Sequence, residues 1–203
     1  MIRMPHSTPH PAAPTRAPEA DGPLVVKVGG GLLASPGALD HVCEALGRIS
    51  AGRSLVVVPG GGPFADAVRE FERRFGLTAD AGHWMALLAM DQYAHVLGER
   101  IPGAELVEDA GGIAAALRRG RLAVLAPYRW LRSADVLPHG WEATGDSVAA
   151  FVAGALDASR LVLVKPADDL AEPVDRAFAA VVPAGLPVSI VGWQRLEAAL
   201  APT

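Results

Sequence analysis

The sequence has a single cysteine, Cys43, and no uninterrupted apolar run of membrane-spanning length. One cysteine cannot form an internal disulfide, so a reducing compartment, the cytoplasm, is the expected location. Charged residues, glycine or proline interrupt every apolar stretch before it reaches ~18 residues, so we expect no membrane partner. The chain also has no block of lysine or arginine, and its net charge is −4. Binding to nucleic acid is therefore not expected, whereas a small anionic ligand held by a few cations is compatible with this charge.

Proline and large apolar residues divide the chain into two unequal parts. Residues 1–23 contain six prolines and almost no large apolar side chains, which predicts a disordered tail. Residues 24–203 are rich in apolar residues, contain no evident linker, and are numerous enough to bury a full core. The sequence therefore predicts one domain over residues 24–203.

The clearest local pattern lies in residues 55–75, which read LVVVPGGGPFADAVREFERRF. The first four residues are typical of a buried strand that ends at Pro59. Glycines 60–62 allow a tight turn, and Pro63 suits the first position of a helix. Unpaired N–H groups at such a helix N-terminus bind anions. The stretch matches neither the Walker A loop nor the GxGxxG pattern, so it predicts an anion site that belongs to neither class.

Short apolar runs alternate with helical patterns along the whole predicted domain. The runs that predict strands are residues 24–28, 55–58, 105–107, 122–126, 160–165 and 188–191. The longest helical pattern covers residues 77–100, with a break expected near Gly82, and residues 127–140 are predicted to form the longest loop. The alternation predicts an α/β fold, a three-layer α/β/α sandwich with a mostly parallel central sheet, which binds ligands at the carboxyl ends of its strands.

Two lysines and one aspartate stand close to glycine turns in the sequence. Lys27 lies near the end of the first predicted strand, just before glycines 29–31, and Lys165 ends the fifth. Asp146 lies in the first turn of a helix that is predicted to begin at Thr144 or Gly145. Taken singly, either lysine would be interpreted as an exposed strand-end cation. Together at one edge of a parallel sheet, they suit phosphoryl transfer, which requires mainly positioning and positive charge; Asp146 would orient them or help to hold Mg²⁺.

Three segments resemble the signature segments of the amino acid kinase superfamily: KVGGGLL at 27–33, VVVPGGGPFADAVR at 56–69 and WEATGDSVAAFVAGAL at 141–156. The superfamily includes acetylglutamate, uridylate, aspartate and isopentenyl phosphate kinases. Residues 82–97 and 161–168 are similar to a compact branch from methanogens and methylotrophic bacteria. The activity of that branch is ATP-dependent phosphorylation of an aminomethylfuran-methyl phosphate on the way to methanofuran. The resemblance therefore implies a kinase that uses ATP and Mg²⁺.

The resemblance also implies roles for individual residues. Three catalytic residues match the family pattern: Lys27, Asp146 and Lys165. The residues implied to bind the nucleotide are Gly29, Gly30, Gly31, Lys165, Ala167 and Asp168. The residues implied to contact the acceptor are Gly60, Gly61, Gly62 and Thr144. The chain departs from the usual family residues at Gly31, Gly145 and Ala167, and no metal site made of protein side chains is expected.

No obvious general base lies near the glycine turns. An acceptor that is already anionic, a phosphate or a carboxylate, needs no such base, although His83 and His95 are alternatives. This agrees with a small-molecule phosphate as the acceptor. If the acceptor carries an aminomethyl cation, an acidic side chain should line its pocket. Of Asp80, Asp91 and Glu142, we expect Asp91 to have this role.

Two other functions stay open at this point. One is a superfamily kinase for a nucleoside monophosphate, an isoprenoid phosphate or an amino acid. The other is a non-catalytic nucleotide- or oxyanion-binding protein with the same fold, which the three departures favour. The superfamily usually associates through a helix near residues 77–100, so the resemblance also implies a homo-oligomer, a dimer or larger.

Overall fold

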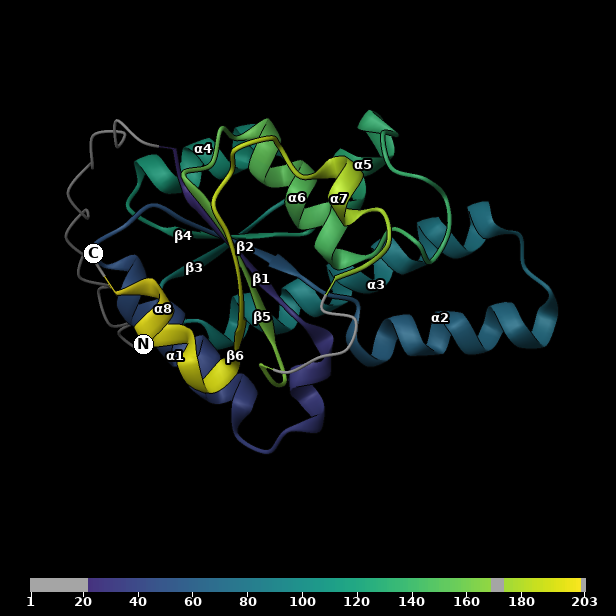
Figure 1. Cartoon of the computed structure of the whole chain (residues 1–203), viewed down its shortest axis with the longest axis horizontal. Coiled ribbons are helices and arrows are strands. Elements are labelled where there is room, and N and C mark those ends of the chain that lie inside the picture. Colours follow the sequence, from purple (N-terminus) through teal and green to yellow (C-terminus); the bar gives the residue numbers. More distant parts are fainter. Residues whose placement is uncertain (1–21, 169–173, 202–203) are drawn as a thin grey trace, which may run out of the picture.

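A computed structural model describes residues 22–168 and 174–201. Residues 1–21, which make up most of the predicted tail, lie outside the described part. The described chain contains a central sheet in which every paired strand is parallel (Figure 1). In chain order its strands are β1 Leu24–Val28, β2 Leu55–Pro59, β3 Ala104–Val107, β4 Leu122–Leu125, β5 Arg160–Lys165 and β6 Val188–Gly192. Their order across the sheet is β3-β4-β2-β1-β5-β6, so β1 and β5 lie side by side at its centre.

Helices cover both faces of this sheet. One face packs against α1 Ala38–Ser50, α8 Leu196–Leu200 and the C-terminal half of α3 Ala79–Arg100. The other face packs against α4 Ala110–Arg118, α5 Tyr128–Ala134, α6 Gly145–Ala155 and α7 Phe178–Val181. Successive strand residues point to opposite faces, so Val26 belongs to the first core and Val25 to the second. These layers confirm the predicted α/β/α sandwich.

The helix α2, Gly62–Phe75, pairs with α3 in a hairpin that extends beyond the sheet (Figure 1). Gly76 ends α2 in the left-handed conformation, with φ 63°, as glycine does at many helix C-termini. No break occurs at Gly82, where the prediction was wrong: α3 is continuous there. A Cβ atom at that position would lie 3.4 Å from the Glu72 carboxylate of α2. The glycine therefore allows the two helices to approach closely.

One further local prediction was wrong. Residues 127–140 are not one long loop, because α5 begins there at Tyr128. The packing of Leu131 into the core stabilises this short helix, whose sequence has no clear helical periodicity. The segment after glycine 29 forms a short 3₁₀ helix, Gly30–Ala34, and α1 then begins at Ala38. Within residues 22–168 and 174–201, no helix has the length and apolarity needed to cross a bilayer.

Candidate active site

Lys27 and Lys165 point to the same face of the sheet from neighbouring strands. β1 and β5 pair in register, with Lys27 opposite Leu163, and odd-numbered residues of both strands face α6. Asp146, in the first turn of α6, lies over this part of the sheet. The parallel sheet therefore assembles the three residues whose catalytic role the sequence implied.

A single carboxylate bridges the two ammonium groups. Lys27 Nζ lies 3.0 Å from Asp146 Oδ1, and Lys165 Nζ lies 2.9 Å and 2.8 Å from Oδ1 and Oδ2. The exposed fractions are 7%, 4% and 8% for Lys27, Asp146 and Lys165, so the charges interact with little screening by water. Burial by itself would raise the pKa of Asp146, but the two ammonium groups outweigh it and hold the pKa below its ordinary value. Burial, together with the charge of Lys27, lowers the pKa of Lys165.

Lys27 and Lys165 are the only two lysines in the chain, and every other residue of this charge is an arginine. A lysine ammonium is a compact point charge with three donors, whereas a guanidinium is a broad planar fork. At the observed spacing, one ammonium can share a carboxylate and still donate to a ligand. The use of lysine at these two positions alone therefore marks the site in the sequence.

The two glycine turns meet backbone to backbone beside the lysines. A Cβ atom on Gly30 would lie only 2.2 Å from Gly62 Cα, and one on Gly60 would lie 2.8 Å from the Gly30 nitrogen. Side chains at Gly30 and Gly60 would therefore force the turns apart. Gly145 borders the same point, since its Cβ would lie 3.1 Å from Lys27 Cε. Glycine at this position thus leaves space around the Lys27 side chain.

Backbone N–H groups in these turns have two different uses. Gly29 N–H donates to the Val164 carbonyl at 3.2 Å, and Gly60 N–H donates to the Val28 carbonyl at 2.8 Å, so both hold the turns in place. The N–H groups of the glycines at 30, 31, 61 and 62 make no hydrogen bond to another described residue. These four donors, next to two ammonium groups, form a cradle for an anion.

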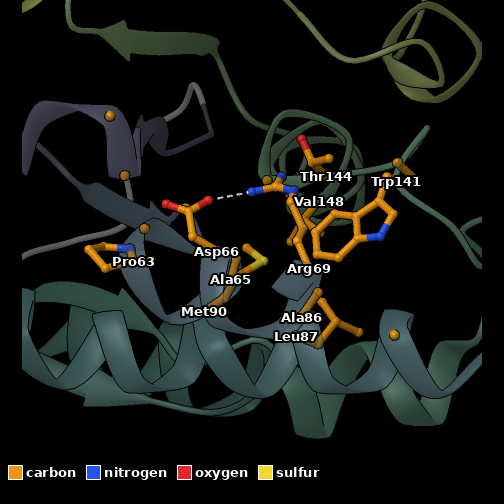
Figure 2. A pocket seen from close by; sticks show the side chains of 18 of the residues that line it. Pro63, Ala65, Asp66, Arg69, Ala86, Leu87, Met90, Trp141, Thr144 and Val148 are labelled. Carbon is orange, nitrogen blue, oxygen red and sulfur yellow. Dashed lines mark hydrogen bonds and ion pairs between the residues drawn. The ribbon is translucent and has the colours of Figure 1, made fainter. Parts of the chain in front are cut away.

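A cavity of about 510 Å³ opens from this cradle between α2, α3 and α6 (Figure 2). Its apolar floor comes from α3, where Ala86, Leu87 and Met90 face inward, and Val148 of α6 closes it above. Pro63 and Trp141 stand at opposite ends of this view. The volume is that of a pocket for a small organic molecule.

Polar groups of α2 line one side of the cavity. Arg69 Nη1 lies 2.7 Å from Asp66 Oδ1, and the Arg69 guanidinium carbon lies 4.1 Å from the centre of the Trp141 ring (Figure 2). Trp141 Nε1 in turn donates to Glu72 Oε2. This chain of contacts fixes the Trp141 ring as a wall of the cavity.

Asp91, the expected acidic residue of the acceptor pocket, does not line the cavity. Its Oδ1 accepts a hydrogen bond from the Tyr128 N–H at 2.9 Å, so it tethers the first turn of α5. The carboxylate that does line the cavity is Asp66. The sequence search missed it because, on a charged helix such as α2, the sequence does not tell a cavity-facing aspartate from a solvated one.

Thr144 lines the cavity at the N-terminus of α6. Asp175 contacts the same helix end, a role that the sequence did not predict. Thr144 N–H and Oγ1 donate to Asp175 Oδ2 at 2.8 Å and 2.9 Å, and Ser147 N–H donates to the same oxygen at 3.0 Å. Asp175 therefore satisfies the first turn of α6, the turn that carries Asp146. Only the tertiary structure reveals this contact, since the two segments lie about thirty residues apart.

The remaining predicted nucleotide residues lie at the carboxyl ends of β5 and β6. Asp168 Oδ1 accepts a hydrogen bond from Gly192 N–H at 2.6 Å, and its Oδ2 lies 3.5 Å from Arg195 Nη1. Ala167 precedes it, and Pro166 lies against Gly31, 3.4 Å from the position of a Cβ atom there. These residues do not line the cavity described above.

Comparison with known proteins gives consistent matches. The family model described as amino acid kinase family matches residues 22–173. The chain is 25% identical over 146 residues to (5-(aminomethyl)furan-3-yl)methyl phosphate kinase of Methanocaldococcus jannaschii, which covers 72% of this chain and 67% of that protein. The uridylate kinase structure from Archaeoglobus fulgidus has a TM-score of 0.67 at 16% identity, covering 88% of this chain and 95% of that one. The UMP kinase structure from Bacillus anthracis has a TM-score of 0.64 at 13% identity, covering 87% and 91%.

Proposed function

The chain belongs to the amino acid kinase family, and from this premise we propose that it transfers the γ-phosphoryl group of ATP to a small-molecule phosphate, giving a diphosphate and ADP. The observation that carries this proposal is the Lys27–Asp146–Lys165 cluster at the meeting point of two glycine turns. Two anions can approach each other there because the cluster has a net positive charge and free N–H donors surround it.

In the proposed reaction, an oxygen of the acceptor phosphate attacks the γ-phosphorus of ATP. A new P–O bond forms there, while the bond to the β-phosphate oxygen breaks and ADP leaves. Lys27 and Lys165 stabilise the negative charge on the transferred group and the leaving oxygen. Asp146 is a positioning residue: both its oxygens are engaged by ammonium groups, and its low pKa makes it a poor base. An anionic phosphate requires no base, in agreement with this assignment.

The donor set fits ATP with Mg²⁺. Four N–H groups without a hydrogen-bond partner among the described residues, together with two ammonium groups, suit the oxygens and the charge of a polyphosphate. In the part of the chain that the structure describes, no three His, Cys, Asp or Glu side chains cluster to hold a metal. Mg²⁺ therefore fits as an ion held mainly by the phosphates, as is common for this cation, where it would neutralise charge on the nucleotide.

We propose an aminomethylfuran-methyl phosphate as the acceptor. The Methanocaldococcus jannaschii relative carries that substrate in its name, and the cavity has space for one substituted ring beside the glycine cradle. Nucleoside monophosphates, isoprenoid phosphates and amino acids are the competing acceptors. A non-catalytic binding protein of the same fold is the competing function.

The test measures ADP release from Mg-ATP in the presence of this acceptor, for wild type, Lys27→Met and Lys165→Met. We expect acceptor-dependent turnover in wild type and a loss of at least about 100-fold in both variants, the scale of removing one electrostatic stabiliser. Arg118→Met, which removes a charge from the exposed side of α4, is the matched control and should retain wild-type turnover. Turnover with a different acceptor would retain the kinase and reject the furan, whereas ATP binding without turnover on any acceptor would support the binding protein.

The predicted homo-oligomer and cytoplasmic location also stay proposals. On α2, the adjacent rings of Phe71 and Phe75 are 52% and 58% exposed, which is compatible with a contact between copies. Light scattering on wild type and Phe75→Glu is the check. A monomeric wild type would overturn the oligomer.

A further inference from the structure

His83 is a buried polar side chain at the edge of the cavity that the proposed reaction does not use. It is only 8% exposed, it lines the cavity, and its ring packs against Trp84 and His139. A ring nitrogen at a cavity wall can complete its hydrogen bonding with a ligand or with water. Its position therefore points to a ligand group that meets it.

Helix geometry places His83 far from the phosphate cradle. His83, Ala86, Leu87 and Met90 share one face of α3 because they follow the helical repeat, and all four line the cavity. The seven residues from Met90 to His83 correspond to ~10 Å along the helix axis. In Figure 2, α3 runs along the floor from Met90 past Ala86 and Leu87, towards the end where Trp141 stands. A molecule whose phosphate lies in the cradle would reach His83 with its opposite end.

The neighbouring His139 affects the pKa of His83. His139 Nδ1 lies 2.7 Å from Asp80 Oδ1, and its Nε2 lies 2.8 Å from Asp135 Oδ1. Hydrogen bonds to these carboxylates raise the pKa of His139 and favour its imidazolium form. Its ring stacks on His83 with centroids 4.4 Å apart. Burial, together with this adjacent charge, lowers the pKa of His83. A neutral imidazole has one nitrogen that accepts a hydrogen bond.

Carboxylates outnumber cations around His83 by one. The three carboxylates and two cations are Asp80, Asp135, Glu142, His139 and Arg132. Arg69 and Glu72 beside Trp141 add one charge of each sign, so this end of the cavity keeps an excess of one negative charge, whereas the cradle at Lys27 and Lys165 is net positive. A molecule with a phosphate at one end and an ammonium group at the other matches this polarity.

We propose that His83 is the specificity-determining residue of the cavity and accepts a hydrogen bond from an amine at the end of the acceptor opposite its phosphate. The proposal rests on the proposed function, because it takes the cradle as the site of the acceptor phosphate. From the sequence, we expected Asp91 to recognise the amine of the acceptor. The proposal gives this role to His83 instead.

The experiment compares two acceptors, the aminomethylfuran-methyl phosphate and its analogue with a methyl group in place of the aminomethyl group. Wild type should have a kcat/KM about 10- to 100-fold higher for the amine, as expected for one hydrogen bond to a charged group. His83→Phe keeps the stacked ring and removes the acceptor nitrogen, so it should bring this ratio close to one by lowering kcat/KM for the amine much more than for the methyl analogue. His83→Gln keeps an acceptor oxygen and should restore part of the preference.

The matched control is His95→Phe, the same substitution on the exposed face of the same helix, which should keep the wild-type ratio. The proposal is overturned if His83→Phe weakens both acceptors equally or leaves the ratio unchanged.

A wild type that turns over neither acceptor would reject the proposed furan acceptor and would require a separate test of His83. Calorimetric titration of the two acceptors into wild type and His83→Phe would then decide. A preference for the amine that the variant loses supports the assignment, and equal affinities, or no binding of either compound, overturn it.

Discussion

Replacement of Asp146 by asparagine tests whether the carboxylate organises the site electrostatically. The substitution keeps size and shape but leaves two buried ammonium groups, at 2.8–3.0 Å from the former carboxylate, without a counter-ion. Removing one partner of a buried ion pair typically costs about 3–5 kcal/mol of unfolding free energy. For a domain of this length that corresponds to a fall in Tm of about 10 °C. Turnover should fall in parallel, because the lysines lose their shared anchor.

The assay is equilibrium urea denaturation of the purified variants at neutral pH. Asp66→Asn is the matched control: its ion pair with Arg69 has a similar distance but an exposed carboxylate, so its loss should cost less than about 1 kcal/mol. In the double variant with Lys27→Met, part of the stability lost in Asp146→Asn should return, since one uncompensated charge is removed. A loss in Asp146→Asn no larger than that of the control would refute the reasoning.

The stability that the Asp146 ion pairs provide should also depend on pH. The pKa of Asp146 is lower in the folded protein than its ordinary value of 3.8. Its ion pairs therefore stabilise the fold above that pH. As the pH falls, Asp146 takes up a proton in the unfolded chain before it does so in the folded protein, so this contribution is lost as the pH passes through the folded-state pKa. The difference in stability between wild type and Asp146→Asn should accordingly be large at neutral pH and shrink below pH 3.8. A difference that stays constant into this acidic range would contradict the assignment.

Four further substitutions have defined expectations. Gly30→Ala places a Cβ atom 2.2 Å from Gly62 Cα and should abolish turnover. Gly31→Ala should be tolerated, because the nearest atom to its Cβ, in Pro166, is 3.4 Å away. Steady-state kinetics of the two variants checks both expectations. Asp175→Ala leaves the first turn of α6 uncapped and should lower stability by about 1–2 kcal/mol in thermal denaturation. Tyr93 is fully buried with a hydroxyl that has no partner among the described residues, so Tyr93→Phe should leave the Tm unchanged or raise it; a clear fall would reveal a partner.

Much of the fold and the centre of the site could be predicted from the sequence because they follow from local patterns. The strand Leu24–Val28 is a run of apolar residues on both sides of Lys27, and the structure has it with the same bounds. The glycines at 60–62 follow an apolar run and come directly before Pro63, a local pattern that predicts a turn followed by a helix. Once the strands are parallel and adjacent, their carboxyl ends must lie together, and this alone brings Lys27 towards Lys165.

The walls of the cavity could not be predicted in this way, because they depend on which segments meet in space. Asp66 and Asp91 are both aspartates on helices, but the packing of α2 against α3 brings only Asp66 to the cavity, while Asp91 meets the backbone of Tyr128. The environment of His83 depends on His139, which lies more than fifty residues later in the chain and stacks on its ring. The sequence by itself determined the strands, the turns and the lysines, since each follows from propensity and period along a few residues. Only the tertiary structure decided the acceptor end of the site, because burial, stacking and charge there arise between segments that are remote along the chain.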